Sequence, residues 1–134
     1  MELNLKRPIV FLDLETTGTN VGADRIVEIG LLKIFPNGSK DSRTYKVNPT
    51  IPIPEETSKI HGIYDKDVKD APTFKDLSAE LNTFLGGSDL GGYNSNKFDI
   101  PLLIEEFTRC NIDFDILTRK LIDVQNIFHK MEQR

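Results

Sequence analysis

Hydrophobic residues in the first third of the chain follow the short, dense pattern of buried strands. The segment PIVFLDLET (8–16) is rich in apolar and β-branched residues and opens with a proline, which predicts a first strand. RIVEIGLLKI (25–34) predicts a second strand, and SRTYKVNP (42–49) alternates as a half-buried third strand does. The turn signal PNG (36–38) separates the last two. Short connections between three successive strands predict an antiparallel meander.

The period of the pattern changes in the second half of the chain. Over TFKDLSAELNTFLGG (73–87) the apolar residues recur at helical spacing, which predicts a helix that begins near Thr73 and ends at Gly86. Three elements follow: a strand at 89–94, a helix at 100–111, and a fifth strand at 120–128 that runs into the start of a helix. This order predicts an α/β fold with a five-stranded mixed sheet, in which the last two strands run parallel to the first.

Size and composition indicate one globular domain. The chain has 134 residues, of which 38% are hydrophobic and 28% charged, and this suits a single domain spanning 1–134. The net charge of −4 and the sequence pI of about 5.2 argue against general electrostatic attraction to nucleic acid or to an anionic membrane. A polyanionic substrate would therefore need local groups or bound cations to hold it.

Cysteine usage and hydropathy restrict the cellular compartments in which we expect this protein. Cys110 is the only cysteine, which excludes an internal disulfide and a cysteine-based metal site. This is typical of a reducing, cytoplasmic location. The apolar run after Arg7 is interrupted at Asp13, too early for a signal peptide, and no segment approaches the roughly 20 apolar residues of a membrane span. We therefore expect no membrane partner.

Two acidic side chains interrupt the first predicted strand. Asp13 and Glu15 stand two positions apart in FLDLETTGT (11–19), so they share one face of the strand. Their backbones lie about 6.5 Å apart at ~3.3 Å per residue. Oxygen ligands at that spacing suit Mg²⁺ or Mn²⁺ better than zinc. The alternative is an edge strand that carries two solvated acids.

Two further polar features accompany this pair. TTG at 16–18 turns away from the strand and offers backbone N–H groups and hydroxyls to a phosphate or sugar, although a plain polar turn explains it too. Asp99, in YNSNKFDIPLL (93–103), lies at the start of the second predicted helix, just past the fourth strand. It could be the N-cap of that helix, but the Asn and Ser residues at 94–96 are candidates for the same role.

These motifs resemble those of the DEDD superfamily of 3′→5′ exonucleases. The subgroup resembled is the histidine-containing (DEDDh) one, which includes the proofreading exonuclease subunit of bacterial DNA polymerase III. FLDLETTGT, DRIVEIG, SKIHGI and GYNSNKFDIPLL occur in this order and spacing, and the similarity extends from about Pro8 to Phe128. DLETTG with a downstream N-x-x-x-F-D is a specific combination. The resemblance implies a ribonuclease H-like fold, in which helices flank the five-stranded mixed sheet.

Carried over residue by residue, the resemblance makes Asp13, Glu15 and Asp99 catalytic metal ligands, the last one directly or through water. Two Mg²⁺ or Mn²⁺ ions about 4 Å apart would polarise a phosphodiester, activate a water molecule and stabilise the leaving 3′-oxygen. In-line attack would then release a nucleoside monophosphate from the 3′ end of DNA or RNA. The implied partners are a nucleic acid with a single-stranded or frayed 3′ end and, as a further candidate, a DNA polymerase.

The resemblance also places seven residues at the substrate: Leu14, Thr16, Thr17, Gly18, His61, Asn94 and Phe98. Three of them have an alternative role. His61 could be a loop residue whose ring packs the neighbouring isoleucines. Asn94 could hold Asp99 instead of contacting the substrate. Phe98 could belong to the core rather than stack on a base.

The third motif of the family has no match in these residues. In the subgroup a general-base histidine precedes the fourth acid by five residues, but Arg134 stands five positions after His129, and Asp123 comes too early. We therefore expect a domain truncated at its C-terminus, without its last helix and weakly active or inactive by itself. The alternative is a non-catalytic module on the same fold that binds nucleic acid or a polymerase. A sheet face left open by a missing helix would favour self-association.

Overall fold

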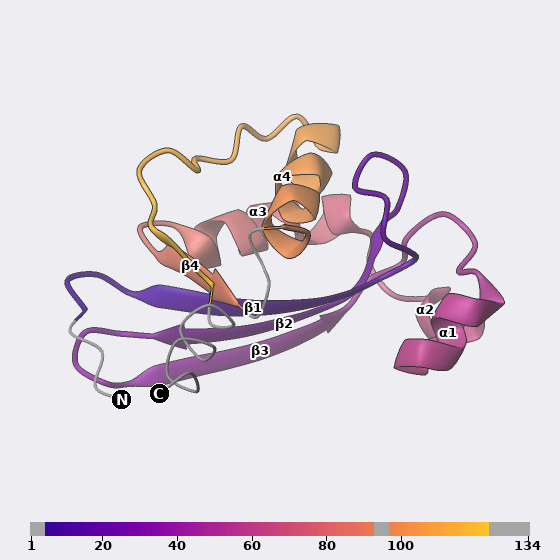
Figure 1. Cartoon of the computed structure of the whole chain (residues 1–134), viewed down its shortest axis with the longest axis horizontal. Helices are drawn as coiled ribbons and strands as arrows, with labels where there is room; N and C mark the ends of the chain where they lie inside the picture. Colours follow the sequence, from indigo (N-terminus) through magenta and orange to yellow (C-terminus); the bar gives the residue numbers. More distant parts are fainter. Residues whose placement is uncertain (1–4, 93–96, 124–134) are drawn as a thin grey trace, which may run out of the picture.

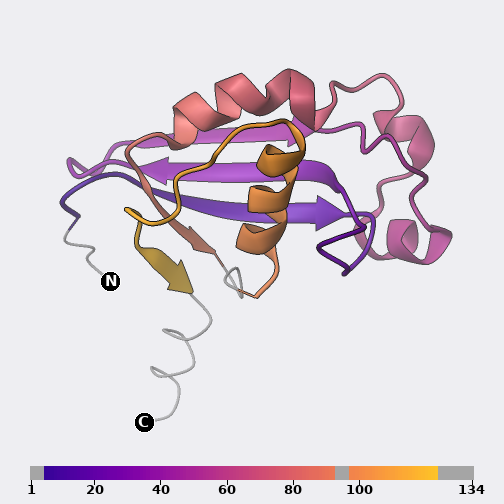
Figure 2. The ribbon, with the colours of Figure 1, turned by 90° about the horizontal axis from the view of Figure 1, so that it is seen from above.

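The chain forms one mixed sheet with helices packed against one of its faces (Figure 1; Figure 2). The computed structural model describes residues 5–92 and 97–123. The elements in chain order are β1 (Ile9–Thr16), β2 (Ile26–Ile34), β3 (Lys40–Lys46), α1 (Glu55–His61), α2 (Asp65–Val68), α3 (Phe74–Leu85), β4 (Asp89–Gly92), α4 (Asp99–Arg109) and β5 (Leu121–Asp123). The strand order in the sheet is β3-β2-β1-β4-β5.

β1 lies at the centre of the sheet and pairs with strands of both directions. It pairs antiparallel with β2, which pairs antiparallel with β3. On its other side it pairs parallel with β4, which is parallel to β5. The predicted meander and the predicted five-stranded mixed sheet are both confirmed. Among the described residues β4 pairs with β1 over Ile9–Phe11, the first part of β1.

Side-chain alternation along β1 separates a buried face from an open face. Val10, Leu12 and Leu14 point into the main core, whereas Asp13 and Glu15 point to the opposite face. α3 and α4 lie together on the first face, and no helix of the described residues lies against the second (Figure 1). Both acids of β1 therefore keep access to water, which an ionised carboxylate requires when it has no partner.

The main core joins the sheet to both long helices. α3 begins with a capping box, because the Thr73 hydroxyl accepts from the Asp76 N–H and the Asp76 carboxylate accepts from the Thr73 N–H. The predicted start of this helix is thereby confirmed. α4 contributes the fully buried Phe107, which packs edge-on against Phe74 and stacks on Phe114 with ring centroids 4.7 Å apart. These ring contacts join α4 to the start of α3 and to the segment that follows α4.

Two short helices were missed in the sequence. α1 and α2 are 7 and 4 residues long, too short to display a helical period. They lie beyond the end of the sheet (Figure 1), where a second, smaller core forms around Val27, Ile53, Ile63 and Val68. Their packing brings the end of α1 close to the end of β1.

The remaining predicted elements form with shifted boundaries. β3 ends at Lys46 rather than at residue 49, because the chain leaves the sheet and Asn48 forms an isolated bridge with Thr73. The second predicted helix begins one residue earlier than expected, at Asp99, and ends at Arg109.

The fourth and fifth strands are described over part of their predicted length. β4 ends at Gly92 and β5 at Asp123. The predicted continuation of the fifth strand into a helix lies outside the described residues, as does His129. Within the described ranges no helix is long and apolar enough to cross a membrane.

Candidate active site

The acid pair of β1 lies on the open face, near the carboxyl end of the strand. Asp13 is exposed and Glu15 is half-buried. Glu15 stands opposite Glu28 in the antiparallel register, and Glu28 forms an ion pair with Lys46 of β3. Burial raises the pKa of Glu15, and the charges of Asp13 and Glu28 raise it further, while His61 and Lys46 lower it. The pair therefore carries a local excess of negative charge that a cation would relieve.

Asp99 adds a third carboxylate close enough to Asp13 and Glu15 to interact with their charges. It is the first residue of α4, and the preceding Phe98 occupies the N-cap position, so the N-cap alternative for Asp99 is wrong. Its carboxyl group accepts a hydrogen bond from the Leu14 N–H. The pKa of Asp99 is raised to about 6, chiefly by burial and further by the charges of Asp13 and Glu15, while the Leu14 hydrogen bond opposes this rise.

Asp13, Glu15 and Asp99 are candidate ligands for a cation, and each offers only carboxylate oxygens. The charge of Asp13 raises the pKa of Glu15, and the charges of Asp13 and Glu15 raise the pKa of Asp99. In the part of the chain that the structure describes, no group of three or more His, Cys, Asp or Glu side chains is arranged to hold a metal ion by itself. Mg²⁺ is commonly bound through one or two carboxylates, with water and substrate phosphates as the other ligands. An all-oxygen cluster of mutually repelling acids suits Mg²⁺ or Mn²⁺ in that manner.

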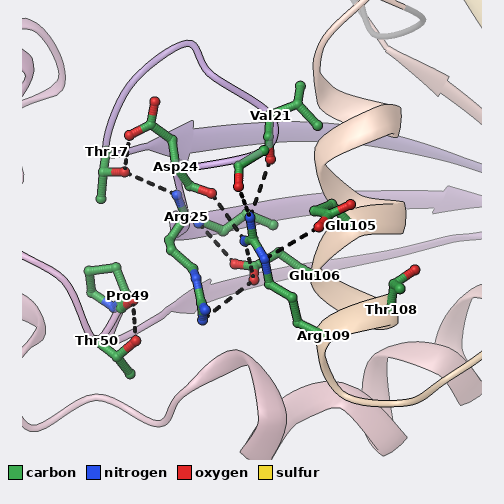
Figure 3. A network of polar contacts seen from close by, with 12 residues as sticks. Thr17, Val21, Asp24, Arg25, Pro49, Thr50, Glu105, Glu106, Thr108 and Arg109 are labelled. Carbon is green, nitrogen blue, oxygen red and sulfur yellow. Dashed lines mark hydrogen bonds and ion pairs between the residues drawn. The ribbon is translucent and has the colours of Figure 1, made fainter.

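The turn after β1 is held by its own side chains. Thr17 is 1% exposed, and its hydroxyl donates to Asp24 Oδ1 at 2.8 Å and accepts from the Arg25 N–H at 3.0 Å (Figure 3). The Thr16 hydroxyl donates to the Gly18 carbonyl at 2.7 Å. A Cβ at Gly18 would lie 2.5 Å from the Asp24 carboxylate, so any larger residue would displace that carboxylate from its hydrogen bonds to Thr17 and Asn20. Both hydroxyls are engaged within the protein. The Thr17 N–H also donates to the Arg25 carbonyl at 2.9 Å, so internal hydrogen bonds fix the shape of the turn.

His61 ends α1 beside this turn. Its Nε2 lies 3.0 Å from the Thr16 carbonyl oxygen, and its Nδ1 accepts from the Ile63 N–H at 3.1 Å. Because that amide can only donate, the proton of the neutral ring resides on Nε2, which donates to Thr16. The alternative in which the ring packs both neighbouring isoleucines is wrong for Ile60, which is 85% exposed. His61 thus ties α1 to the turn, close enough to Glu15 to lower its pKa.

Two other predicted substrate residues have side chains in or against the core. Leu14 is 7% exposed, so it can offer a ligand only its backbone. Phe98 is half-buried and packs against the main core, in agreement with the core alternative. Asn94 lies outside the described residues.

A cavity of about 360 Å³ opens on the sheet face that carries Asp13. Phe11 and Gly30 line it together with Thr44 of β3. Its volume lies in the range of small-ligand pockets. Asp13 therefore borders a hollow that can receive an apolar group.

Three residues that shape the site were missed in the sequence. Glu106 is 1% exposed on the core side of α4, two helical turns after Asp99, and Arg109 and Asp24 connect that helix to the turn. An acidic residue at a position where the pattern predicts a buried apolar one indicates a special role, and this holds for a glutamate on the apolar face of a helix as it does for an aspartate inside an apolar strand. That signal could have identified Glu106.

The protein belongs to the exonuclease family, because the sequence model of that family (RNase_T) matches residues 10–133. It is 35% identical over 131 residues to DNA polymerase III subunit epsilon of Buchnera aphidicola subsp. Schizaphis graminum, covering 92% of this chain and 52% of the relative. It is 30% identical over 119 residues to 3′-5′ exonuclease DinG of Staphylococcus haemolyticus, covering 87% of this chain and 13% of the relative. The chain thus spans about half the length of the first relative and much less of the second.

Solved structures of exonuclease I share the fold. E. coli exonuclease I in complex with a dT13 oligonucleotide has a TM-score of 0.84 at 16% identity, over 95% of this chain and 30% of that chain. The product-bound structure of exonuclease I also has a TM-score of 0.84 at 16% identity, over 96% of this chain and 32% of that chain. The ribonuclease H-like fold expected from the sequence is thereby confirmed.

Proposed function

We propose that the protein is a metal-dependent 3′→5′ exonuclease domain that hydrolyses phosphodiester bonds at the 3′ end of DNA or RNA. The observation that carries this proposal is the meeting of Asp13, Glu15 and Asp99 at the carboxyl end of β1, with pKa values raised for the last two. Membership of the exonuclease family supports the reaction, and the name of the DinG relative supports the direction.

The position of each residue determines its role. Asp13 and Glu15 would hold divalent cations from the open face, and Asp99 would hold them from the start of α4. Two Mg²⁺ or Mn²⁺ ions bound there would polarise the phosphodiester and lower the pKa of an attacking water. The backbone of the turn after β1, which His61 braces through the Thr16 carbonyl, would lie against the terminal nucleotide. The product would be a nucleoside monophosphate.

The same proposal covers partners and location. Bound cations would draw a 3′ end, single-stranded or frayed, to a chain whose net charge is −4. A DNA polymerase is the candidate protein partner, because one relative is a DNA polymerase III subunit. A cytoplasmic location agrees with a single free cysteine, Cys110.

We expect slow hydrolysis, because the third family motif has no match in the sequence. Self-association of the open face stays a prediction, which sedimentation velocity over a concentration series checks.

Manganese binding is the first test. Isothermal titration calorimetry should detect Mn²⁺ binding to the wild type, and Asp13→Asn should weaken it at least about tenfold, because it removes a charged ligand. Asp113→Asn removes the same charge from an exposed residue outside the site, and its affinity should match the wild type. Absence of Mn²⁺ binding to the wild type, or binding that Asp13→Asn leaves unchanged, would refute the nuclease proposal.

Digestion of end-labelled oligonucleotides tests the reaction itself. Single-stranded DNA and RNA labelled at the 5′ end should shorten slowly from the 3′ end with Mg²⁺ or Mn²⁺ present, and Asp13→Asn should abolish the shortening. The ratio of the two rates decides the preferred sugar. Oligonucleotide binding that needs no metal, without any digestion, would instead favour the non-catalytic binding module.

A further inference from the structure

A buried network of polar contacts connects α4 to the β1–β2 loop (17–25), as Figure 3 shows. Glu106 is 1% exposed; its Oε2 accepts from the Ile26 N–H at 3.1 Å and its Oε1 accepts from Arg109 Nη1 at 3.1 Å. The Arg25 guanidinium lies 3.9 Å from the same carboxylate. A buried carboxylate is strongly destabilising unless its oxygens are paired in this way. The fold therefore depends on these contacts to keep the Glu106 carboxylate paired in the interior.

Arg109 extends the network into the loop. Its Nη1 also donates to the Asp24 carbonyl at 3.1 Å, and its Nη2 donates to the Val21 and Gly22 carbonyls at 3.3 and 3.2 Å. In Figure 3 the guanidinium lies between Glu106 on its own helix and these three loop carbonyls. Only a planar fork with several donors can serve so many acceptors, and a lysine ammonium cannot.

Hydrogen bonds within the β1–β2 loop connect the residues that Arg109 holds to the Thr16–Gly18 turn. The Asp24 carboxylate accepts from the Thr17 hydroxyl and from the Asn20 N–H, both at 2.8 Å. The Asp24 carbonyl is one of the groups that Arg109 holds. α4 begins with Asp99, so one helix both supplies a carboxylate of the site and fixes the loop next to it.

We propose that Arg109, held by Glu106, is a positioning residue for the Thr16–Gly18 turn and sets the affinity of the site for a 3′-terminal nucleotide. This inference rests on the proposed function. Without the clamp the loop would sample other conformations, and the apparent affinity would fall with the fraction of molecules in the closed one. Arg109 lies at the opposite end of α4 from Asp99, about 15 Å away at 1.5 Å per residue, and its guanidinium bonds to the loop and to Glu106, so cation binding should not depend on it.

The test compares Arg109→Lys with the wild type in the full chain. Amide hydrogen exchange of residues 17–25 reports the clamp, and calorimetry gives the affinity for Mn²⁺ and, at saturating Mn²⁺, for thymidine 5′-monophosphate. We expect faster exchange in the loop, nucleotide affinity about five- to tenfold weaker, and unchanged Mn²⁺ affinity. Arg7→Lys is the matched control, because Arg7 pairs with Asp89 at the opposite end of β1, and it should behave as the wild type.

Glu106→Gln provides a second variant in case Arg109→Lys does not fold. It keeps an acceptor for Ile26 and removes the Glu106 charge from Arg109 and Arg25, while Glu105 still pairs with Arg109 at 3.7 Å. It should show the same pattern, more weakly. Loop exchange and nucleotide affinity equal to the wild type in the folded variant would overturn the inference, and so would a parallel loss of Mn²⁺ and nucleotide affinity. A wild type that binds neither Mn²⁺ nor the nucleotide overturns the proposed function and the inference together, and it does so before any variant is compared.

Discussion

Replacing Asp99 by asparagine should stabilise the metal-free protein at neutral pH. The pKa of Asp99 is raised from its ordinary value of 3.8 to about 6 in the folded chain. The folded protein therefore binds this proton more tightly than the unfolded chain, and stability falls as the pH rises from about 4 to about 6. Above pH 6 the whole cost of the buried charge is present. Asparagine removes that charge and keeps an oxygen that can accept from the Leu14 N–H.

The magnitude follows from the size of the pKa rise. A rise from 3.8 to about 6 corresponds to about 3 kcal/mol, at 1.36 kcal/mol per pKa unit. Asp99 retains substantial contact with solvent, which reduces the cost to about 1–2 kcal/mol. We expect Asp99→Asn to raise the free energy of unfolding by that amount at pH 7.5 and by about 0.5 kcal/mol or less at pH 4.

Urea denaturation in EDTA at the two pH values measures this difference. Asp113→Asn controls for the change in net charge and should leave the stability within about 0.5 kcal/mol of the wild type. Added Mg²⁺ or Mn²⁺ should stabilise the wild type more than Asp99→Asn, because it binds the folded wild type more tightly. An Asp99→Asn protein that is no more stable than the wild type at pH 7.5, or equally stabilised at pH 4, would show that the buried charge is not the source of the effect.

Two further predictions concern the loop and the core. Gly18→Ala should lower the free energy of unfolding by about 1–3 kcal/mol, because its Cβ would lie 2.5 Å from the Asp24 carboxylate, whereas Gly22→Ala, with its nearest contact at 3.5 Å, should cost less than about 1 kcal/mol. Equal costs in urea denaturation would contradict the steric argument. Phe107→Ala should cost about 3–5 kcal/mol and Phe107→Leu less than half as much, because leucine keeps most of the buried apolar volume. A thermal or urea transition close to that of the wild type in Phe107→Ala would show that the stacked rings are not central to the core.

Local sequence patterns were enough to predict the main elements of the sheet and to propose the acids of the candidate site. β1, β2 and α3 were predictable because each carries a strong local pattern: dense apolar runs in the strands, and helical spacing after the Thr73 cap in α3. Asp13 and Glu15 were identifiable because two acids in an apolar strand must share a face. All of these signals lie between residues that are close in the chain.

Only the tertiary structure decided how these parts cooperate. The hydrogen bond from the Ile26 N–H to Glu106 joins residues 80 positions apart, and the bond from Arg109 to the Asp24 carbonyl joins residues 85 apart. It also showed that the Thr17 hydroxyl serves Asp24 rather than a ligand. A single side chain does not reveal its partner when the two meet only after the sheet and α4 have packed. Local periodicity therefore predicts the strands, the longer helices and the acids. The contacts of Arg109 with the loop and the raised pKa of Asp99 arise from burial and long-range contact, which periodicity does not reveal.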